Sequence, residues 1–275
     1  MRKRTAIKTA RSALFYAGAA ALCVGPLFVF VWMIMTGLKT GVQNITYPPE
    51  FLFTPTLENF QAVFQQHHFF RYLMNSLIIA TLATGLSLVL GLPAAYSIAK
   101  YRQGRIGMII LLARMPPFVS YLLPWYIIFR YLKLIDTYTA LTLTHLIITL
   151  PMVAWLMVAF FESVPAELED AAMIDGCSRL KSFLIIVLPL VRNGIATSAI
   201  MAFIFSWNQF LFSLILSGPQ TKTVPVAVYN FISYGKIDWA GIGAAATLIV
   251  LPVSVFAFFV RKTIVQGLTM GALKD

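Results

Sequence analysis

The chain has 275 residues, of which 59% are hydrophobic and only 11% are charged. Soluble domains carry about 25% charged residues, so this composition excludes an ordinary soluble protein, and the 14% aromatic content excludes a disordered one. The net charge of +11 is spread over loops between apolar runs, without a basic face interleaved with aromatic residues, so we expect no nucleic-acid partner. Cys23 and Cys177 are too few for a disulfide scaffold. We therefore predict a polytopic membrane protein.

Six apolar runs approach or exceed the roughly 20 residues that a bilayer-spanning helix needs. They lie at residues 13–38, 74–99, 106–130, 138–161, 194–217 and 240–261. The first run follows a basic N-terminus, but it is too long for a cleaved signal peptide and no small-residue cleavage site follows, so we interpret it as a retained helix. Bends or breaks are expected at prolines in or beside the runs: Pro116, Pro117, Pro124, Pro151 and Pro252. The sequence predicts an all-α protein with about six transmembrane helices.

The distribution of Lys and Arg predicts the orientation, because cytoplasmic loops retain basic residues. With the N-terminus inside, the cytoplasmic segments hold fourteen basic residues and the opposite loops hold six, while Arg114 lies within the third run. This count predicts a cytoplasmic tail at 1–12, a first helix at 13–38 and an extracytoplasmic loop at 39–73. Five helices follow within 74–261, and residues 262–275 form a second cytoplasmic tail, so both termini are cytoplasmic.

Motifs of catalytic and metal sites are absent from the sequence. It has no G-x-x-x-x-G-K-[ST] phosphate loop, no H-E-x-x-H, no G-x-S-x-G and no Cys/His cluster with metal-ligand spacing. His67 and His68 have no carboxylate or cysteine nearby, so we interpret them as loop residues. We predict no catalytic residue, no metal site and no cofactor in this chain.

The segment 162–190, between the fourth and fifth runs, breaks the apolar pattern. Half of the ten acidic residues lie in its first fourteen positions, with no basic residue among them: Glu162, Glu167, Glu169, Asp170 and Asp175. Pro165 suits the first position of a short helix, early acidic residues complement the helix dipole, and Gly176 can provide a left-handed stop. The segment therefore predicts a short acidic helix.

A second short helix should follow, because four apolar residues recur at helical spacing before Pro189: Leu180, Phe183, Leu184 and Val187. In the first helix, Ala171, Ala172 and Gly176 form a small-residue patch flanked by carboxylates. Such a helix is either a solvated loop, whose acids only satisfy the helix dipole, or a surface that docks into a basic groove of a partner protein.

Several stretches resemble the permease subunits of binding-protein-dependent ABC importers. Glu169–Gly176, followed by Ile-Val-Leu-Pro-Leu at 186–190, is similar to that family's E-A-A-x-x-x-G…L-P loop. The carbohydrate branch, in particular its maltose-type second permease, is similar over segments 75–102, 205–210 and 266–274. The chain departs from the motif in three places: Cys177 replaces a usual Ala, Asn193 replaces a common Pro, and Asp170 stands where the motif usually has Glu. The last departure leaves open whether Asp170 or Glu169 makes the main ATPase contact.

The resemblance implies a type I ABC importer permease fold in a bacterial inner membrane. It implies a heterodimer with a second permease subunit, two ATPase subunits that bind ATP and Mg, and an extracytoplasmic solute-binding protein. The family's coupling helix, which docks on the ATPase, corresponds to Glu167, Glu169, Asp170, Ala171, Ala172, Asp175 and Gly176. The family's C-terminal segment, which reaches between the ATPase subunits, corresponds to Gln266, Gly267, Leu268 and Thr269.

Polar and aromatic residues in two of the runs are candidates for the path of a carbohydrate or polyol: Ser120, Tyr121, Ser206, Trp207, Asn208 and Gln209. Hydrogen bonds between helices explain such residues equally well. The alternatives are a stand-alone secondary carrier or channel, which would show internal repeats and an ionisable midplane site, and an intramembrane enzyme. The sequence has no clear repeat, and His145 has no evident acidic or nucleophilic companion, so both alternatives are disfavoured.

Overall fold

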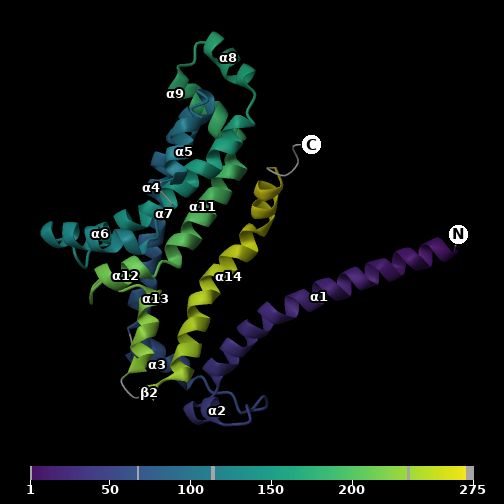
Figure 1. The fold of residues 1–275 in the computed structure, drawn as a ribbon, viewed down its shortest axis with the longest axis vertical. Coiled ribbons are helices and arrows are strands. Elements are labelled where there is room, and N and C mark those ends of the chain that lie inside the picture. The colour runs from purple at the N-terminus through teal and green to yellow at the C-terminus, as the bar shows by residue number, and fades with distance from the viewer. Residues whose placement is uncertain (1, 67, 113–114, 234–235, 271–275) are drawn as a thin grey trace. The chain divides into compact units, whose positions relative to one another are not determined.

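The computed structural model describes residues 2–66, 68–112, 115–233 and 236–270, which are largely helical (Figure 1). The chain divides into two compact units, residues 1–68 with 228–251 and residues 69–227 with 252–275. The only strands among the described residues are β1 (Ile232–Ser233) and β2 (Lys236–Ile237), which form one antiparallel pair. The helical fold class predicted from the sequence is therefore confirmed.

The first unit consists of α1, three short helices, the strand pair and the start of α14. Their bounds are α1 (Arg2–Leu38), α2 (Gly41–Ile45), α3 (Glu58–Gln66), the 3₁₀ helix η2 (Val228–Phe231) and α14 (Trp239–Met270). A Cβ on Gly37 would lie 2.8 Å from the backbone nitrogen of Ala244, so α1 and α14 touch through their backbones there. The side chain of Asn59 donates to the carbonyls of Gly37 and Lys39, both at 2.8 Å, and satisfies the end of α1.

The second unit is built around α4, α7 and α11, which pack on one another (Figure 1). Its elements are α4 (Phe69–Lys100), α5 (Gly104–Leu112), α6 (Val119–Tyr131), α7 (Tyr138–Glu162), α8 (Ala166–Ile174), α9 (Arg179–Ser182), the π-helix η1 (Phe183–Val187), α10 (Leu188–Leu190), α11 (Arg192–Trp207), α12 (Leu211–Leu216) and α13 (Val224–Ala227). Figure 1 places α8 and α9 at one end of this bundle and α13 toward the other.

Helix α4 shows the packing logic of this unit. Its buried residues recur every three or four positions and are mostly small: Ile79, Ala80, Ala83, Thr84, Ser87, Gly91 and Ala95. A Cβ on Gly91 would lie 3.0 Å from Cγ1 of Val153, so α4 and α7 approach closely. The exposed residues of α4 include large apolar side chains such as Leu82 and Val89. Small residues between helices and large apolar residues outside are typical of membrane proteins.

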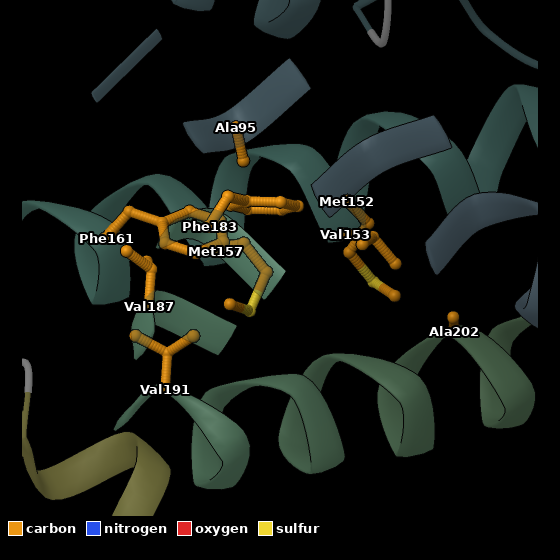
Figure 2. Close-up of a cluster of buried hydrophobic side chains, with 9 residues drawn as sticks. All are labelled: Ala95, Met152, Val153, Met157, Phe161, Phe183, Val187, Val191 and Ala202. Carbon is orange, nitrogen blue, oxygen red and sulfur yellow. The ribbon is translucent and has the colours of Figure 1, made fainter. Parts of the chain in front are cut away.

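The main apolar core lies at the α8 end of this unit. Figure 2 shows how side chains of α4, α7, η1 and α11 meet there, together with Val191 from the turn before α11: Ala95, Met152, Val153, Met157, Phe161, Phe183, Val187, Val191 and Ala202. A second cluster joins α4, α6, α7 and α12 farther along the bundle: Ile79, Phe129, Ala140, Leu141, Ile148, Phe212 and Leu216. The first cluster fixes the segment that follows α8 against the long helices.

Three helices among the described residues are long and apolar enough to cross a membrane, namely Phe15–Leu38, Phe69–Lys100 and Tyr138–Glu162. A fourth is obtained if Arg179–Leu190 and Arg192–Trp207, which meet at a 79° bend, count as one span. The run predicted at 106–130 consists instead of α5 and α6, with Pro116 and Pro117 between them. Proline lacks an N–H and restricts the preceding residue, which explains the break. Arg114 lies outside the described residues.

The run predicted at 194–217 is likewise divided into α11 and α12, and the run at 240–261 lies within α14. The apolar part of α14, Trp239–Val255, is shorter than the other candidate spans. The structure therefore supports three to four spans directly.

Candidate functional site

Helix α8 ends where its sequence predicted, but it begins one residue later than predicted. Pro165 has an extended backbone with ψ of 131° and precedes the helix rather than occupying its first position. Gly176 has φ of +87°, which confirms the left-handed stop. The N–H of Gly176 donates to Met173 at 3.1 Å and that of Cys177 to Ala172 at 2.9 Å, a Schellman arrangement that satisfies the last carbonyls. A residue with a Cβ would be strained at position 176.

The two sides of α8 have different surroundings. Ala172 and Glu169 are buried, whereas the remaining residues assigned to the coupling surface are exposed: Glu167, Asp170, Ala171, Asp175 and Gly176. The exposed side therefore carries three carboxylates beside small residues. It also carries Ile174, which is 86% exposed and which the sequence pattern did not single out.

The buried acid belongs to a network of three side chains, Tyr96, Lys100 and Glu169, named here the Glu169 network. The carboxylate oxygen Oε2 of Glu169 accepts a hydrogen bond from the Tyr96 hydroxyl at 2.5 Å and forms an ion pair with Nζ of Lys100. Nζ of Lys100 also donates to the Tyr96 hydroxyl at 3.0 Å. The Glu169 network therefore connects α8 to the last turns of α4. Sequence reasoning missed Tyr96 and Lys100 as partners of this acid.

Tyr96 is held in place by aromatic packing. Its ring meets Phe161 of α7 edge-on at 5.7 Å and lies 4.7 Å from Phe183 of η1, measured between ring centroids. These two rings belong to the apolar core drawn in Figure 2. The Glu169 network consequently rests on α4, α7 and η1 together.

Two further features surround α8. A shallow cavity of about 200 Å³ lies at its N-terminal end and is lined by residues of α7, α8, α10 and α11, including Phe160, Leu168 and Asn193. After α8, Nη1 of Arg179 at the start of α9 donates to the hydroxyl of Tyr101 at 2.7 Å.

Of the second predicted helix, Phe183 and Val187 are buried but Leu180 and Leu184 are exposed. The wider π-helical turn of η1 breaks the 3.6-residue spacing on which that prediction relied.

The opposite end of α4 is attached to residues 218–224, which comprise the loop after α12 and the first residue of α13. Asp136 accepts hydrogen bonds there from the backbone N–H groups of Gly218, Gln220 and Thr221 and from the Thr221 hydroxyl. Asn75 donates to the carbonyls of Gln220 and Lys222, both at 2.9 Å. Ser76 also accepts a hydrogen bond from the N–H of Val224 at 2.9 Å. We name this group of contacts, formed by Asn75, Ser76 and Asp136 with residues 218–224, the Asp136 clamp.

The hydrogen bonds of the Asp136 clamp favour the ionised carboxylate. Burial alone raises the pKa of Asp136, but the hydrogen bonds from Thr221, Gln220 and Gly218 outweigh it and hold the pKa below its ordinary value of 3.8. A Cβ on Gly218 would lie 2.6 Å from Oδ2 of Asp136, so the close approach requires glycine. The clamp is thus a charged acceptor enclosed by backbone donors.

The residues predicted to line a solute path fall into two groups. Ser206, Trp207 and Gln209 are buried, whereas Ser120 and Asn208 are exposed and Tyr121 is half-buried. Oγ of Ser206 lies 2.7 Å from Nδ1 of the buried His145, and the Trp207 ring stacks on Phe203 at 5.8 Å. Nε1 of Trp207 has no hydrogen-bond partner within the described part of the chain.

The remaining predicted site lies at the end of α14. Gln266, Gly267, Leu268 and Thr269 are helical, and the structure does not describe their side chains. Among the described residues there is no group of three His, Cys, Asp or Glu side chains that could hold a metal ion.

Comparisons with known proteins relate the chain to transport proteins. A family model described as "binding-protein-dependent transport system inner membrane component" matches residues 87–270. The chain is 38% identical over 269 residues to a probable ABC transporter permease protein of Sinorhizobium fredii, covering 97% of each chain. It is 36% identical over 270 residues to a sulfoquinovosyl glycerol transport system permease protein of Agrobacterium fabrum, covering 95% of this chain and 93% of the relative.

Another relative is a trehalose/maltose transport system permease protein of Thermococcus litoralis, 34% identical over 275 residues, with 95% of this chain and 96% of the relative covered. Among solved structures, a bacterial ABC transporter involved in the import of the acidic polysaccharide alginate matches with a TM-score of 0.76 at 20% identity. That match covers 91% of this chain and 95% of the solved one. It shows a common fold.

Proposed function

The chain belongs to the family of binding-protein-dependent transport system inner membrane components, and on that premise we propose that it carries a carbohydrate or a related polyol or glycoside inward. Members of this family are multi-pass, non-catalytic permease subunits of ABC importers. Relatives named for sulfoquinovosyl glycerol and for trehalose/maltose support a sugar-like solute.

The observation that carries the proposal is the exposed side of α8. Asp170, Glu167 and Asp175 present carboxylates beside Ala171 and Gly176. Small residues allow the backbone of a partner to approach closely, and the carboxylates attract basic residues of a partner groove. We therefore propose that α8 is the coupling helix and docks on an ATPase subunit, which binds ATP and Mg and supplies the energy of transport.

The proposed membrane arrangement has six spans with both termini and α8 in the cytoplasm. The excess of basic residues in the segments that would be cytoplasmic supports this orientation. In this arrangement α5 with α6 forms the third span, α11 with α12 the fifth, and α14 the sixth. Breaks in spanning helices are tolerated where they face protein or a water-filled path.

The proposed complex contains a second permease subunit, two ATPase subunits and an extracytoplasmic solute-binding protein. Gln266, Gly267, Leu268 and Thr269 would reach the ATPase subunits from the end of α14. For the solute path, Ser120, Tyr121 and Asn208 are the candidates with exposed surface. Ser206, Trp207 and Gln209 are buried, so we propose that they support the path instead of lining it.

Uptake of labelled solute by cells that contain the whole complex tests the coupling surface. Asp170→Lys reverses a charge at the centre of the exposed side of α8 and should abolish uptake while the protein remains in the membrane. Glu162→Lys reverses an exposed charge that precedes α8 and serves as the matched control, with uptake near that of the unmodified chain. Normal uptake in Asp170→Lys would refute the proposed docking surface. ATP-independent transport by the purified chain would instead favour a stand-alone carrier.

A further inference from the structure

We propose that the Glu169 network is the joint through which α8 moves α4, so that Glu169 is a positioning residue of coupling and not a contact to the ATPase. This inference rests on the proposed function, because it takes α8 to be the helix that docks on the ATPase. It assigns different tasks to two neighbouring acids. Asp170 faces outward to the partner, and Glu169 faces inward to the bundle.

Glu169 is buried against the bundle. Glu169 is 8% exposed, and its carboxylate oxygen Oε2 is bound by Nζ of Lys100 and by the hydroxyl of Tyr96. A buried carboxylate is tolerated when it is paired and hydrogen-bonded, and removing one partner leaves an uncompensated charge. Glu169 is therefore buried and already paired within the chain, whereas Asp170 is exposed.

The connections of α8 to the rest of the bundle differ from helix to helix. The chain connects α8 directly to α7 on one side and to α9 on the other, and α8 packs on α9 and η1. No short chain segment joins α8 to α4, and the side chains of Glu169, Lys100 and Tyr96 supply a direct polar link between these two helices. Because Lys100 and Tyr96 occupy the last turns of α4, a displacement of α8 acts on the end of a 32-residue helix.

Aromatic packing supports the joint. Tyr96 packs on Phe161 and Phe183, and Nζ of Lys100 lies 5.4 Å from the centroid of the Tyr96 ring. The network therefore sits on the apolar core of Figure 2 instead of projecting from a mobile loop. A joint that transmits motion needs such a support, because loose side chains would absorb the displacement.

The test uses the complete complex, with ATPase and solute-binding subunits, reconstituted in proteoliposomes. Glu169→Gln keeps the side-chain shape and removes the charge, and Lys100→Met removes the other partner. We expect both variants to co-purify with the ATPase subunits as the unmodified chain does. The amount of solute transported per ATP hydrolysed should fall by about tenfold. Coupling between two sites typically changes an equilibrium by a factor of this order.

Two further variants separate a joint from a merely structural contact. Lys100→Arg keeps the charge and should restore most of the transport per ATP. Tyr96→Phe keeps the ring packing and removes only the hydroxyl, so it should lower the same ratio by a smaller factor. If every one of these variants is absent from the membrane, the network is needed for folding and the joint is refuted.

The remaining outcomes distinguish this inference from the proposed function. If Glu169→Gln loses the ATPase subunits as Asp170→Lys does, Glu169 is a direct contact and the joint is refuted, while the coupling role of α8 stands. If Glu169→Gln transports normally while Asp170→Lys does not, the joint is again refuted alone. If Asp170→Lys keeps both normal uptake and its ATPase subunits, the proposed coupling role of α8 is refuted, and the inference that rests on it is refuted with it.

Discussion

The two ends of α4 are attached to the rest of the second unit in different ways. At the Lys100 end, the Glu169 network consists of side chains that bind one another. At the Asn75 end, the Asp136 clamp consists of side chains that bind the backbone of a loop. Backbone groups of a loop have few alternative partners, so the clamp fixes the loop in one conformation.

The Asn75 end of α4 is therefore fixed by the Asp136 clamp, whereas the Lys100 end can move with α8. The Glu169 network joins α8 to the end of α4 through side chains alone, so these two helix ends can move together while the ion pair persists. A loop held through several backbone groups cannot move without losing those hydrogen bonds together. We therefore expect substitutions at the Glu169 end to change coupling and substitutions at the Asp136 clamp to change stability.

The largest effect should come from the cap of α8. Gly176→Val places a β-branched residue at φ of +87°, where it cannot continue the Schellman arrangement, so α8 loses its defined end. We expect uptake to be abolished while the protein remains in the membrane. Gly176→Asn should retain part of the uptake, because Asn tolerates left-handed backbone.

Gly104→Val is the matched control for this substitution, because a Cβ at Gly104 meets nothing within 4 Å and its backbone is helical. Radiolabelled uptake together with the amount of protein in the membrane measures all three variants. Equal uptake in Gly176→Val and Gly104→Val would show that the left-handed stop has no role in coupling.

The next effect concerns the Asp136 clamp. Asp136→Asn replaces one carboxylate oxygen by an NH₂ group, which cannot accept hydrogen bonds from backbone N–H groups. If Oδ1 is replaced, the hydrogen bonds from Gly218 and Thr221 are lost, and if Oδ2 is replaced, the hydrogen bond from Gln220 is lost. Loss of hydrogen bonds to a charged group should lower the free energy of unfolding by about 3 kcal/mol. Thermal unfolding in detergent measures this change, and Glu58→Gln, at an exposed acid of α3, is the control.

The same variant gives a pH dependence with a defined sign. Because the pKa of Asp136 in the folded chain lies below its ordinary value of 3.8, the ionised carboxylate stabilises the fold above that pH. The stabilisation decreases as the pH falls below 3.8 and is lost once the pH passes the folded pKa. The difference in melting temperature between the unmodified chain and Asp136→Asn should therefore be constant near neutrality and should shrink in acid. A difference that grows in acid would contradict the assignment.

A smaller effect is expected at Asn75. Asn75→Leu removes two donors to loop carbonyls and leaves the hydroxyl of Tyr138, which donates to Asn75 at 2.7 Å, without this acceptor. The cost should be about 2 kcal/mol, and Tyr138→Phe, which removes only the last of these hydrogen bonds, should cost about 1 kcal/mol. Thermal unfolding ranks the two variants. The opposite ranking would show that Asn75 does not hold the loop.

Much of the α8 end could be predicted from the sequence. The left-handed stop at Gly176 is a local feature, and the apolar runs around α1, α4 and α7 identified those helices. The inward orientation of Glu169 could not be predicted, because its partner Lys100 lies on another helix and a sequence pattern shows only the faces of one helix. The available signal was Lys100 at the end of the run 74–99, because that end and the acidic segment 162–190 were predicted on the same side of the membrane.

The Asp136 clamp was missed for a related reason. Asp136 lies in a short connection without a recognisable motif, and its partners are backbone groups, which leave no pattern of side chains. Prolines were the only signal for helix breaks in the sequence, and Pro124, Pro151 and Pro252 nevertheless lie inside helices α6, α7 and α14 without breaking them. Pro116 and Pro117 indicated the break between α5 and α6, whereas the break between α11 and α12 has no proline within it. Burial of Ser206 and Trp207 depends on packing against other helices and likewise has no local signal.

The smallest effect should come from the exposed hydrogen bond at the α8 end. Tyr101→Phe removes the acceptor of Nη1 of Arg179, and both side chains are exposed, so water replaces the lost partner. We expect a change in unfolding free energy below about 0.5 kcal/mol and unchanged transport per ATP. The same ratio should fall strongly in Glu169→Gln, although the two contacts lie at the same end of α4. A defect in Tyr101→Phe comparable to that in Glu169→Gln would mean that any contact between this segment and α4 transmits motion, and that the buried ion pair has no special part in it.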